Sequence, residues 1–155
     1  MIEIERKYLV KNLEFKSLSK KVSTIIQGYL NNDPNKSVRI RLTENNAYIT
    51  IKGKSLNDGL SRYEWEKKIP REEGVELLKL CKDQLIYKKR YYINIEDFII
   101  EVDEFLDKNK GLYIAEIELD SLNKKLRLPT WIGEEVTGVN KYYNLNLINK
   151  PFNKW

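Results

Sequence analysis

The sequence predicts a fold of the α+β class that is mainly β, because it contains eight strand-like segments and only two helical ones. In most of the strand-like segments charged side chains alternate with apolar ones, and a period of two residues is that of a β-strand. Turn-forming sequences separate the segments, as expected of antiparallel strands. We expect strands at residues 1–10, 22–30, 37–42, 47–54, 62–69, 85–94, 98–105 and 112–120.

The first of these segments, MIEIERKYLV, has an ordered charge pattern. Glu3, Glu5 and Lys7 fall on one face of the strand, and the other face is apolar apart from Arg6. Two carboxylates two residues apart can converge on a cation, and a lysine beyond them can hold an anion. A plain alternative exists for this segment alone, because a charged strand face is usually a solvated one.

After the fifth strand the hydrophobic period changes to that of a helix. Pro70 suits the first turn of a helix, and acidic residues followed by apolar ones at helical spacing come next. We therefore expect a helix at residues 70–82. Cys81 is assigned to the packed side of this helix, because no neighbouring group suggests an activated thiol.

A second helix is expected at residues 140–148, with Asn140 as its N-cap and with Tyr142, Leu145 and Leu147 turned inward. The remaining segments are predicted to be connections. Residues 11–21 should form a polar connection, residues 31–36 a turn, and residues 149–155 a tail that is ordered if Phe152 or Trp155 docks.

Composition narrows the chemistry. A chain of 155 residues has the size of one domain, and a net charge of +5 favours anionic partners. The chain has one cysteine and no histidine, which excludes an internal disulfide, a Ser-His pair and a His-ligated zinc. Catalysis must then use carboxylates, Lys, Arg, Tyr or a hard cation held by oxygen. The sequence shows no apolar leader or membrane span, so we expect a cytoplasmic protein.

The charged strand faces, taken together, allow two structures. The simpler one is an open antiparallel sheet whose charged face lies in water. The other is a closed barrel of about eight strands with a charged interior. That interior would need a highly negative ligand with matching cations, and a polyphosphate with divalent metals meets both demands. The acids are Glu3, Glu5, Glu64, Glu66, Glu101, Asp103, Glu116 and Glu118, and the bases are Lys7, Arg39, Arg41, Lys52, Lys54, Lys88 and Arg90.

The order of these motifs resembles a known family. The opening Glu3-Ile4-Glu5-Arg6-Lys7 is similar to the E-x-E-x-K signature of the CYTH superfamily, the triphosphate tunnel metalloenzymes. The resemblance covers nearly the whole chain, and its last part is similar to short bacterial members. The other matching motifs are Val38-Arg39-Ile40-Arg41, Thr50-Ile51-Lys52, Tyr63-Glu64-Trp65-Glu66, Lys88-Lys89-Arg90-Tyr91, Glu101-Val102-Asp103 and Ala115-Glu116-Ile117-Glu118-Leu119.

The resemblance implies one tunnel domain over residues 1–155. It would be a closed eight-stranded antiparallel barrel with a charged lumen and a few flanking helices, and the helix at 140–148 would plug or line one end. The implied phosphate ligands are Lys7, Arg39, Arg41, Lys52, Lys88 and Arg90, and the implied metal ligands are Glu3, Glu5, Asp103, Glu116 and Glu118. Catalysis would fall to Glu3, Glu5, Lys7, Lys88 and Glu118, with Glu64 in support, whereas Lys54, Glu66 and Glu101 are candidates for structural roles.

The function implied by the resemblance is hydrolysis of inorganic tripolyphosphate to pyrophosphate and phosphate. The implied cofactor is Mg²⁺ or Mn²⁺, and we expect two ions. A class IV-type adenylate cyclase or a thiamine triphosphatase could use the same site. A non-enzymatic barrel that binds polyphosphate or RNA through aromatic residues such as Tyr63 and Trp65 is a third hypothesis. We expect a small anionic triphosphate as the partner, neither nucleic acid nor membrane, and a monomer or homodimer.

Overall fold

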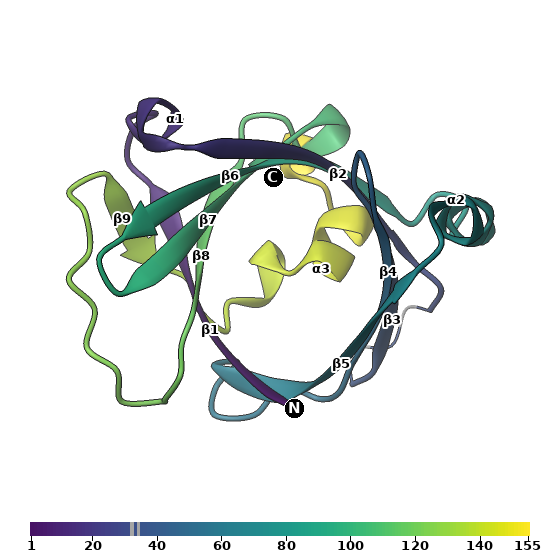
Figure 1. The fold of residues 1–155 in the computed structure, drawn as a ribbon, viewed down its shortest axis with the longest axis horizontal. Helices are drawn as coiled ribbons and strands as arrows, with labels where there is room; N and C mark the ends of the chain where they lie inside the picture. Colours follow the sequence, from purple (N-terminus) through teal and green to yellow (C-terminus); the bar gives the residue numbers. More distant parts are fainter. Residues whose placement is uncertain (32, 34) are drawn as a thin grey trace.

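Eight antiparallel strands close into a barrel in the computed structural model, which describes residues 1–31, 33 and 35–155 (Figure 1). Neighbouring strands follow the order β5-β4-β3-β2-β6-β7-β8-β1, and pairing between β1 and β5 closes the ring. A further strand, β9, pairs with the end of β1. The strands are β1 (Ile2–Val10), β2 (Lys21–Tyr29), β3 (Ser37–Leu42), β4 (Ala47–Lys52), β5 (Ser61–Ile69), β6 (Leu85–Ile95), β7 (Phe98–Phe105), β8 (Tyr113–Glu118) and β9 (Ile132–Glu135).

Strand β1 is where the ring closes. Its first residues pair with β5, which puts Glu3 opposite Arg62, and its middle pairs with β8, which puts Lys7 opposite Glu116. Directly opposed residues of antiparallel strands point to the same face, so these charges all turn into the barrel. The predicted closed barrel with a charged lumen is therefore confirmed.

The apolar strand faces point outward and are covered by helices and loops. Helix α2 (Arg71–Leu80) lies outside β3 and β4, and a Cβ at Gly74 would come within 2.4 Å of the Ala47 Cβ, so this glycine permits a close approach. On another part of the wall, α1 (Phe15–Leu18) buries Phe15 completely against Trp131 and Tyr91. One hydrophobic core of the barrel, around Phe15 and Trp131, thus lies on the outside of the ring, and the charged side chains lie inside it.

Short helices of the C-terminal segment enter the barrel, and Figure 1 shows α3 within the ring of strands. Buried Tyr142 and Leu147 pack there in an apolar cluster that includes Ile86 and Phe105 of the wall. This cluster fills part of the barrel interior. The helices are η2 (Asn140–Tyr142) and α3 (Asn144–Asn149), and two further short helices, η1 (Asp107–Asn109) and η3 (Phe152–Lys154), contact each other.

The single helix expected at residues 140–148 is wrong. Tyr143 separates η2 from α3, because its φ of −72° and ψ of 141° are those of extended backbone. Asn140 is the first residue of η2 rather than its cap, and Val139 occupies the N-cap position without a side-chain hydrogen bond. Inward packing is confirmed for Tyr142 and Leu147, and Leu145 lines the central cavity.

The remaining elements agree with the expected ones in part. The expected helix at 70–82 is confirmed in a shorter form, and Cys81 beyond its end is buried as expected. The predicted connection at 11–21 contains α1, and β9 was not predicted at all. In the predicted turn at 31–36, Asn32 and Pro34 lie outside the described residues. The tail does dock, because the Trp155 ring packs edge-on against Tyr142 with a centroid distance of 5.4 Å.

The helices formed by the described residues are all too short or too polar to span a lipid bilayer.

Candidate active site in the barrel

The barrel encloses a cavity of about 940 Å³, within the range of small-molecule sites. Among the described residues, eight acidic and eight basic side chains line it, so their formal charges cancel. The acids are Glu3, Glu5, Glu64, Glu66, Asp97, Glu101, Glu116 and Glu118, and the bases are Lys7, Arg39, Arg41, Lys52, Lys54, Arg62, Lys88 and Arg90. A neutral stretch near the C-terminal segment includes Asn140, Tyr143, Asn144 and Leu145.

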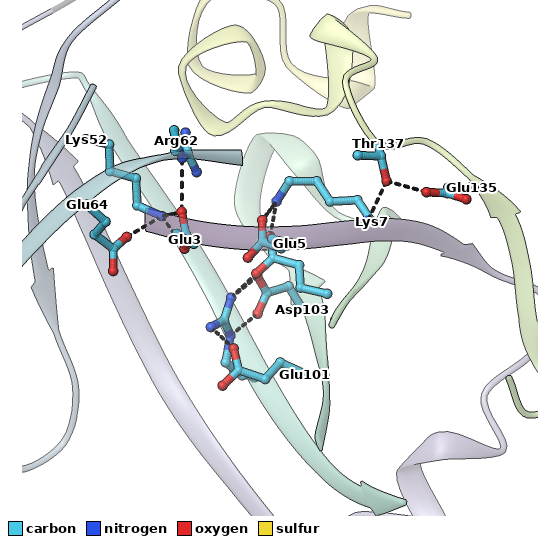
Figure 2. Close-up of polar contacts among 12 residues, drawn as sticks. Glu3, Glu5, Lys7, Lys52, Arg62, Glu64, Glu101, Asp103, Glu135 and Thr137 are labelled. Atoms are coloured by element: carbon cyan, nitrogen blue, oxygen red, sulfur yellow. Dashed lines mark hydrogen bonds and ion pairs between the residues drawn. The ribbon is translucent and has the colours of Figure 1, made fainter. Parts of the chain in front are cut away.

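One charge cluster gathers around Glu3, as Figure 2 shows. Lys52 Nζ donates to both oxygens of Glu3 at 2.8 and 2.9 Å and lies 2.6 Å from Glu64. Arg62 Nε donates to Glu3 at 3.0 Å. Burial lowers the pKa of Lys52, and the nearby cations Arg39 and Arg62 lower it further. Lys52 is therefore a base whose charge depends on its carboxylate partners.

A second cluster is centred on Lys7. Its Nζ lies 2.8 Å from Glu5 and also donates to Glu116. Burial opposes the charge of Lys7, but Glu116 and Glu5 together raise its pKa above the ordinary value. The backbone N–H of Lys7 donates to Thr137 Oγ1 at 3.0 Å, which ties β1 to the C-terminal segment (Figure 2). Lys7 is thus a firmly held, charged side chain.

The most deeply buried cluster joins β6 and β7. Lys88 Nζ donates to Asp103 Oδ2 at 2.5 Å, and Arg90 donates to the two Asp103 oxygens at 2.6 and 2.7 Å. Arg90 also donates to Glu116 at 2.6 Å and to Glu101. Burial opposes both cations: it lowers the pKa of Lys88 to about 8, whereas Asp103 and Glu116 raise that of Arg90 well above its usual value. Arg90 therefore stays charged, whereas Lys88 loses its proton more readily than an exposed lysine does.

A fourth cluster is formed by β3, β4 and β5. Arg41 Nη2 donates to Glu66 Oε1 at 2.9 Å, and Arg39 Nη2 lies 3.6 Å from Glu66 Oε2. Thr50 Oγ1 donates to the same carboxylate at 2.6 Å. Burial lowers the pKa of Arg41, and the neighbouring Arg39 adds to this. One carboxylate therefore bridges two arginines that project from the same strand.

Glu118 differs from the other acids of the lumen. Within the described residues no hydrogen bond or ion pair engages its side chain. Burial raises the pKa of Glu118, and the carboxylates of Glu3, Glu5 and Glu64 raise it further. These four acids are therefore close enough to repel one another, and they supply oxygen donors that a hard divalent cation would neutralise.

The structure brings together almost all the residues that the sequence indicated. Of the predicted phosphate and metal ligands, all except Asp103 line the cavity, as do Glu64, Lys54, Glu66 and Glu101. Asp103 is completely buried behind Lys88 and Arg90, and both its oxygens are engaged by these bases. In this conformation no three acidic or cysteine side chains of the described residues are gathered as a metal site.

Sequence reasoning missed Arg62 and Tyr29. Arg62 has the same strand parity as Glu64 and Glu66, so its position on the charged face could have been read from the pattern. Tyr29 belongs to β2, which contributes no charged side chain to the cavity among the described residues, and it lies opposite Arg39 in the β2–β3 register. Such a strand gives no charge signal, so only the register places it.

The site is the lumen of a closed barrel in which acidic and basic side chains pair. Known proteins share this fold. The CYTH domain description matches residues 1–150. The chain belongs to the CYTH family. A relative called inorganic triphosphatase, from Acetivibrio thermocellus, is 47% identical over 151 residues, which are 97% of this chain and 95% of that protein.

Two further comparisons place this CYTH protein among similar chains. An inorganic triphosphatase from Nitrosomonas europaea is 32% identical over 149 residues, covering 93% of this chain and 95% of the relative. The crystal structure of the inorganic triphosphatase NE1496 superimposes with a TM-score of 0.65 at 27% identity, covering 94% of this chain and 93% of that one. The barrel is thus shared along almost the full length of both proteins.

Proposed function

We propose that this CYTH protein is a divalent-metal-dependent triphosphatase that hydrolyses inorganic tripolyphosphate to pyrophosphate and phosphate. The observation that carries the proposal is the lumen, where eight basic side chains face the same cavity as eight acidic ones. Two relatives with the name inorganic triphosphatase, each aligned over more than nine tenths of this chain, support the choice of substrate. The proposal takes residues 1–155 as one catalytic domain.

The phosphates would be held by the bases of four strands. Arg39 and Arg41 project two residues apart from β3, and Lys88 and Arg90 do the same from β6. Guanidinium groups bind phosphate oxygens through two parallel hydrogen bonds, whereas an ammonium group acts as a point charge. With Lys7 on β1 and Lys52 on β4, these bases surround the cavity from several sides and would stabilise negative charge on both the transferred and the leaving phosphate.

The carboxylates fit the chemistry of a hard cation, because they are oxygen donors crowded enough to raise the pKa of Glu118. Glu3, Glu5, Glu116 and Glu118 would hold Mg²⁺ or Mn²⁺, with Glu64 in support, and we propose two ions. When bound, such ions neutralise phosphate charge and favour deprotonation of water. Glu118, which forms no ion pair with a described residue, is best suited among them to bind and orient that water.

Asp103 has a different place in the proposal. Its carboxylate is buried and engaged by Lys88 at 2.5 Å and by Arg90 at 2.6 and 2.7 Å. We assign it as a positioning residue that fixes these two bases toward the lumen, in place of the metal-ligand role that the family resemblance implied. Arg62 joins the site in a similar way, because it holds Glu3 from β5.

A substrate panel tests the proposal. The protein is incubated with tripolyphosphate, ATP or thiamine triphosphate, each with Mg²⁺, Mn²⁺ or EDTA, and the products are identified. We expect phosphate and pyrophosphate from tripolyphosphate, and only with a metal. Cyclic AMP from ATP, or thiamine diphosphate as the fastest product, would replace the proposal by one of the related activities.

Glu118→Gln is the matched variant, because it removes one charge and changes no volume. We expect turnover of tripolyphosphate to fall by orders of magnitude, since the neutral amide lacks the negative charge and one of the two oxygens with which a carboxylate binds a hard cation. The control is Asp120→Asn, two residues away on an exposed pair with Lys124. Equal turnover in the two variants would contradict the role of Glu118.

A further inference from the structure

Glu66 holds the two arginines of β3 much as a phosphate group would. One carboxylate oxygen accepts from Arg41 at 2.9 Å, the other lies 3.6 Å from Arg39, and Thr50 donates to the carboxylate at 2.6 Å. Both charged partners of Glu66 among the described residues are therefore bases. Its side chain is 27% exposed, which leaves it room to move away when a ligand enters.

The same arrangement extends to other bases of the lumen. Lys52 is shared by Glu3 and Glu64, and Arg90 contacts Glu101. Formal charges of the cavity-lining residues described here cancel, although the whole chain carries +5. An incoming polyanion therefore meets no net positive charge in the tunnel. It must displace carboxylates from the bases that are to bind it.

We propose that Glu66 is an internal competitor of the substrate, whose carboxylate occupies the Arg39–Arg41 phosphate site until a phosphate group displaces it. This inference rests on the proposed function only in placing phosphate at those arginines, and it does not require hydrolysis. It assigns Glu66 the task of setting the affinity of the tunnel for triphosphate. The alternative is that Glu66 orients the two arginines for the ligand.

Coupling between cations and the triphosphate follows from the same pairing. A cation that draws Glu3 or Glu64 away from Lys52 makes this base available to phosphate, and phosphate bound to Lys52 makes the acids available to the cation. Such a coupling is reciprocal, because each ligand must change the binding affinity for the other by the same factor. The two kinds of ligand should therefore bind with positive cooperativity.

Calorimetric titration with tripolyphosphate in EDTA tests the competitor role without any metal or turnover. We expect Glu66→Gln to bind tripolyphosphate about fivefold more tightly than the unmodified protein, since partly exposed ion pairs contribute up to about 1 kcal/mol. Glu64→Gln, which removes one of the two carboxylates that engage Lys52, should shift the affinity in the same direction. The control is Glu76→Gln, on an exposed pair with Lys79 in α2, which should leave the affinity unchanged.

The sign of the change decides between the two roles. Weaker or equal binding by a folded Glu66→Gln variant overturns the competitor role and indicates that Glu66 orients the arginines. Thermal melting with and without tripolyphosphate checks folding, and the variant should gain more stability from the ligand than the unmodified protein does. Tripolyphosphate hydrolysis by the unmodified protein with Mg²⁺ is measured in parallel. If the unmodified protein hydrolyses tripolyphosphate but Glu66→Gln binds it no more tightly, only the competitor role is refuted. If the unmodified protein has no activity, only the proposed function is refuted.

Discussion

Asp103→Asn is expected to be one of the most destabilising isosteric changes in the barrel. Asp103 is 0% exposed and is the counter-ion of Lys88, which is 2% exposed, and of Arg90. Removing one partner of a buried ion pair costs about 3–5 kcal/mol, because a charge is left uncompensated. Arg90 keeps Glu101 and Glu116 as partners, so the main loss falls on Lys88. We therefore expect the lower figure, about 3 kcal/mol.

The loss is measured as the free energy of unfolding in urea, and as a melting temperature that falls by about 6–12 °C at roughly 2–4 °C per kcal/mol. Asp120→Asn, on the exposed pair with Lys124, serves as the control and should leave both quantities unchanged. A loss below about 1 kcal/mol for Asp103→Asn would refute the argument. It would mean that Lys88 is neutral or already solvated in the folded protein.

Two further variants test the wall of the barrel. Glu104 accepts hydrogen bonds from Lys16 and Tyr91; burial opposes its charge, but these bonds lower its pKa below the unfolded value. Its stabilising contribution is therefore present above the unfolded pKa and is lost as the pH falls through the folded pKa. Glu104→Gln should unfold more easily in urea at neutral pH and match the unmodified protein in strong acid; a pH-independent difference would contradict this. Gly28→Ala would place a Cβ 2.6 Å from Cys81 Sγ, and should lower the free energy of unfolding by about 1–3 kcal/mol in the same assay. An unchanged value would show that α2 shifts freely.

Strand periodicity was enough to predict which side chains share a charged strand face, whereas the family resemblance was needed to expect that these faces line a lumen. Glu3, Glu5 and Lys7 alternate with apolar residues, and the same spacing recurs on six other strands, so each charged face could be assigned before any pairing was known. Arg62 was within reach of the same reasoning, because it precedes Glu64 by two residues. Tyr29 was not, since β2 contributes no charged side chain to the cavity among the described residues.

The C-terminal segment was harder to predict for a physical reason. Tyr142 and Leu145 have the three-residue spacing of a helix face, but contacts with the barrel interior outweigh local preferences in so short a segment. Tyr142 and Leu147 enter the apolar cluster around Phe105, and Tyr143 breaks the helix between them. Side-chain burial inside the ring, which no local pattern reports, therefore decided where the helices begin and end.

The sequence by itself determined that this protein has charged strand faces, with carboxylates and bases in a fixed order, and that it has no histidine for acid–base chemistry. The tertiary structure alone decided which acid meets which base. Register across β6 and β7 places Asp103 opposite Arg90 and buries it, whereas Glu118, on β8, forms no ion pair with any of the described residues. The physical reason is that alternation along a strand depends on backbone geometry alone, while partnership depends on closure of the ring and on depth within it.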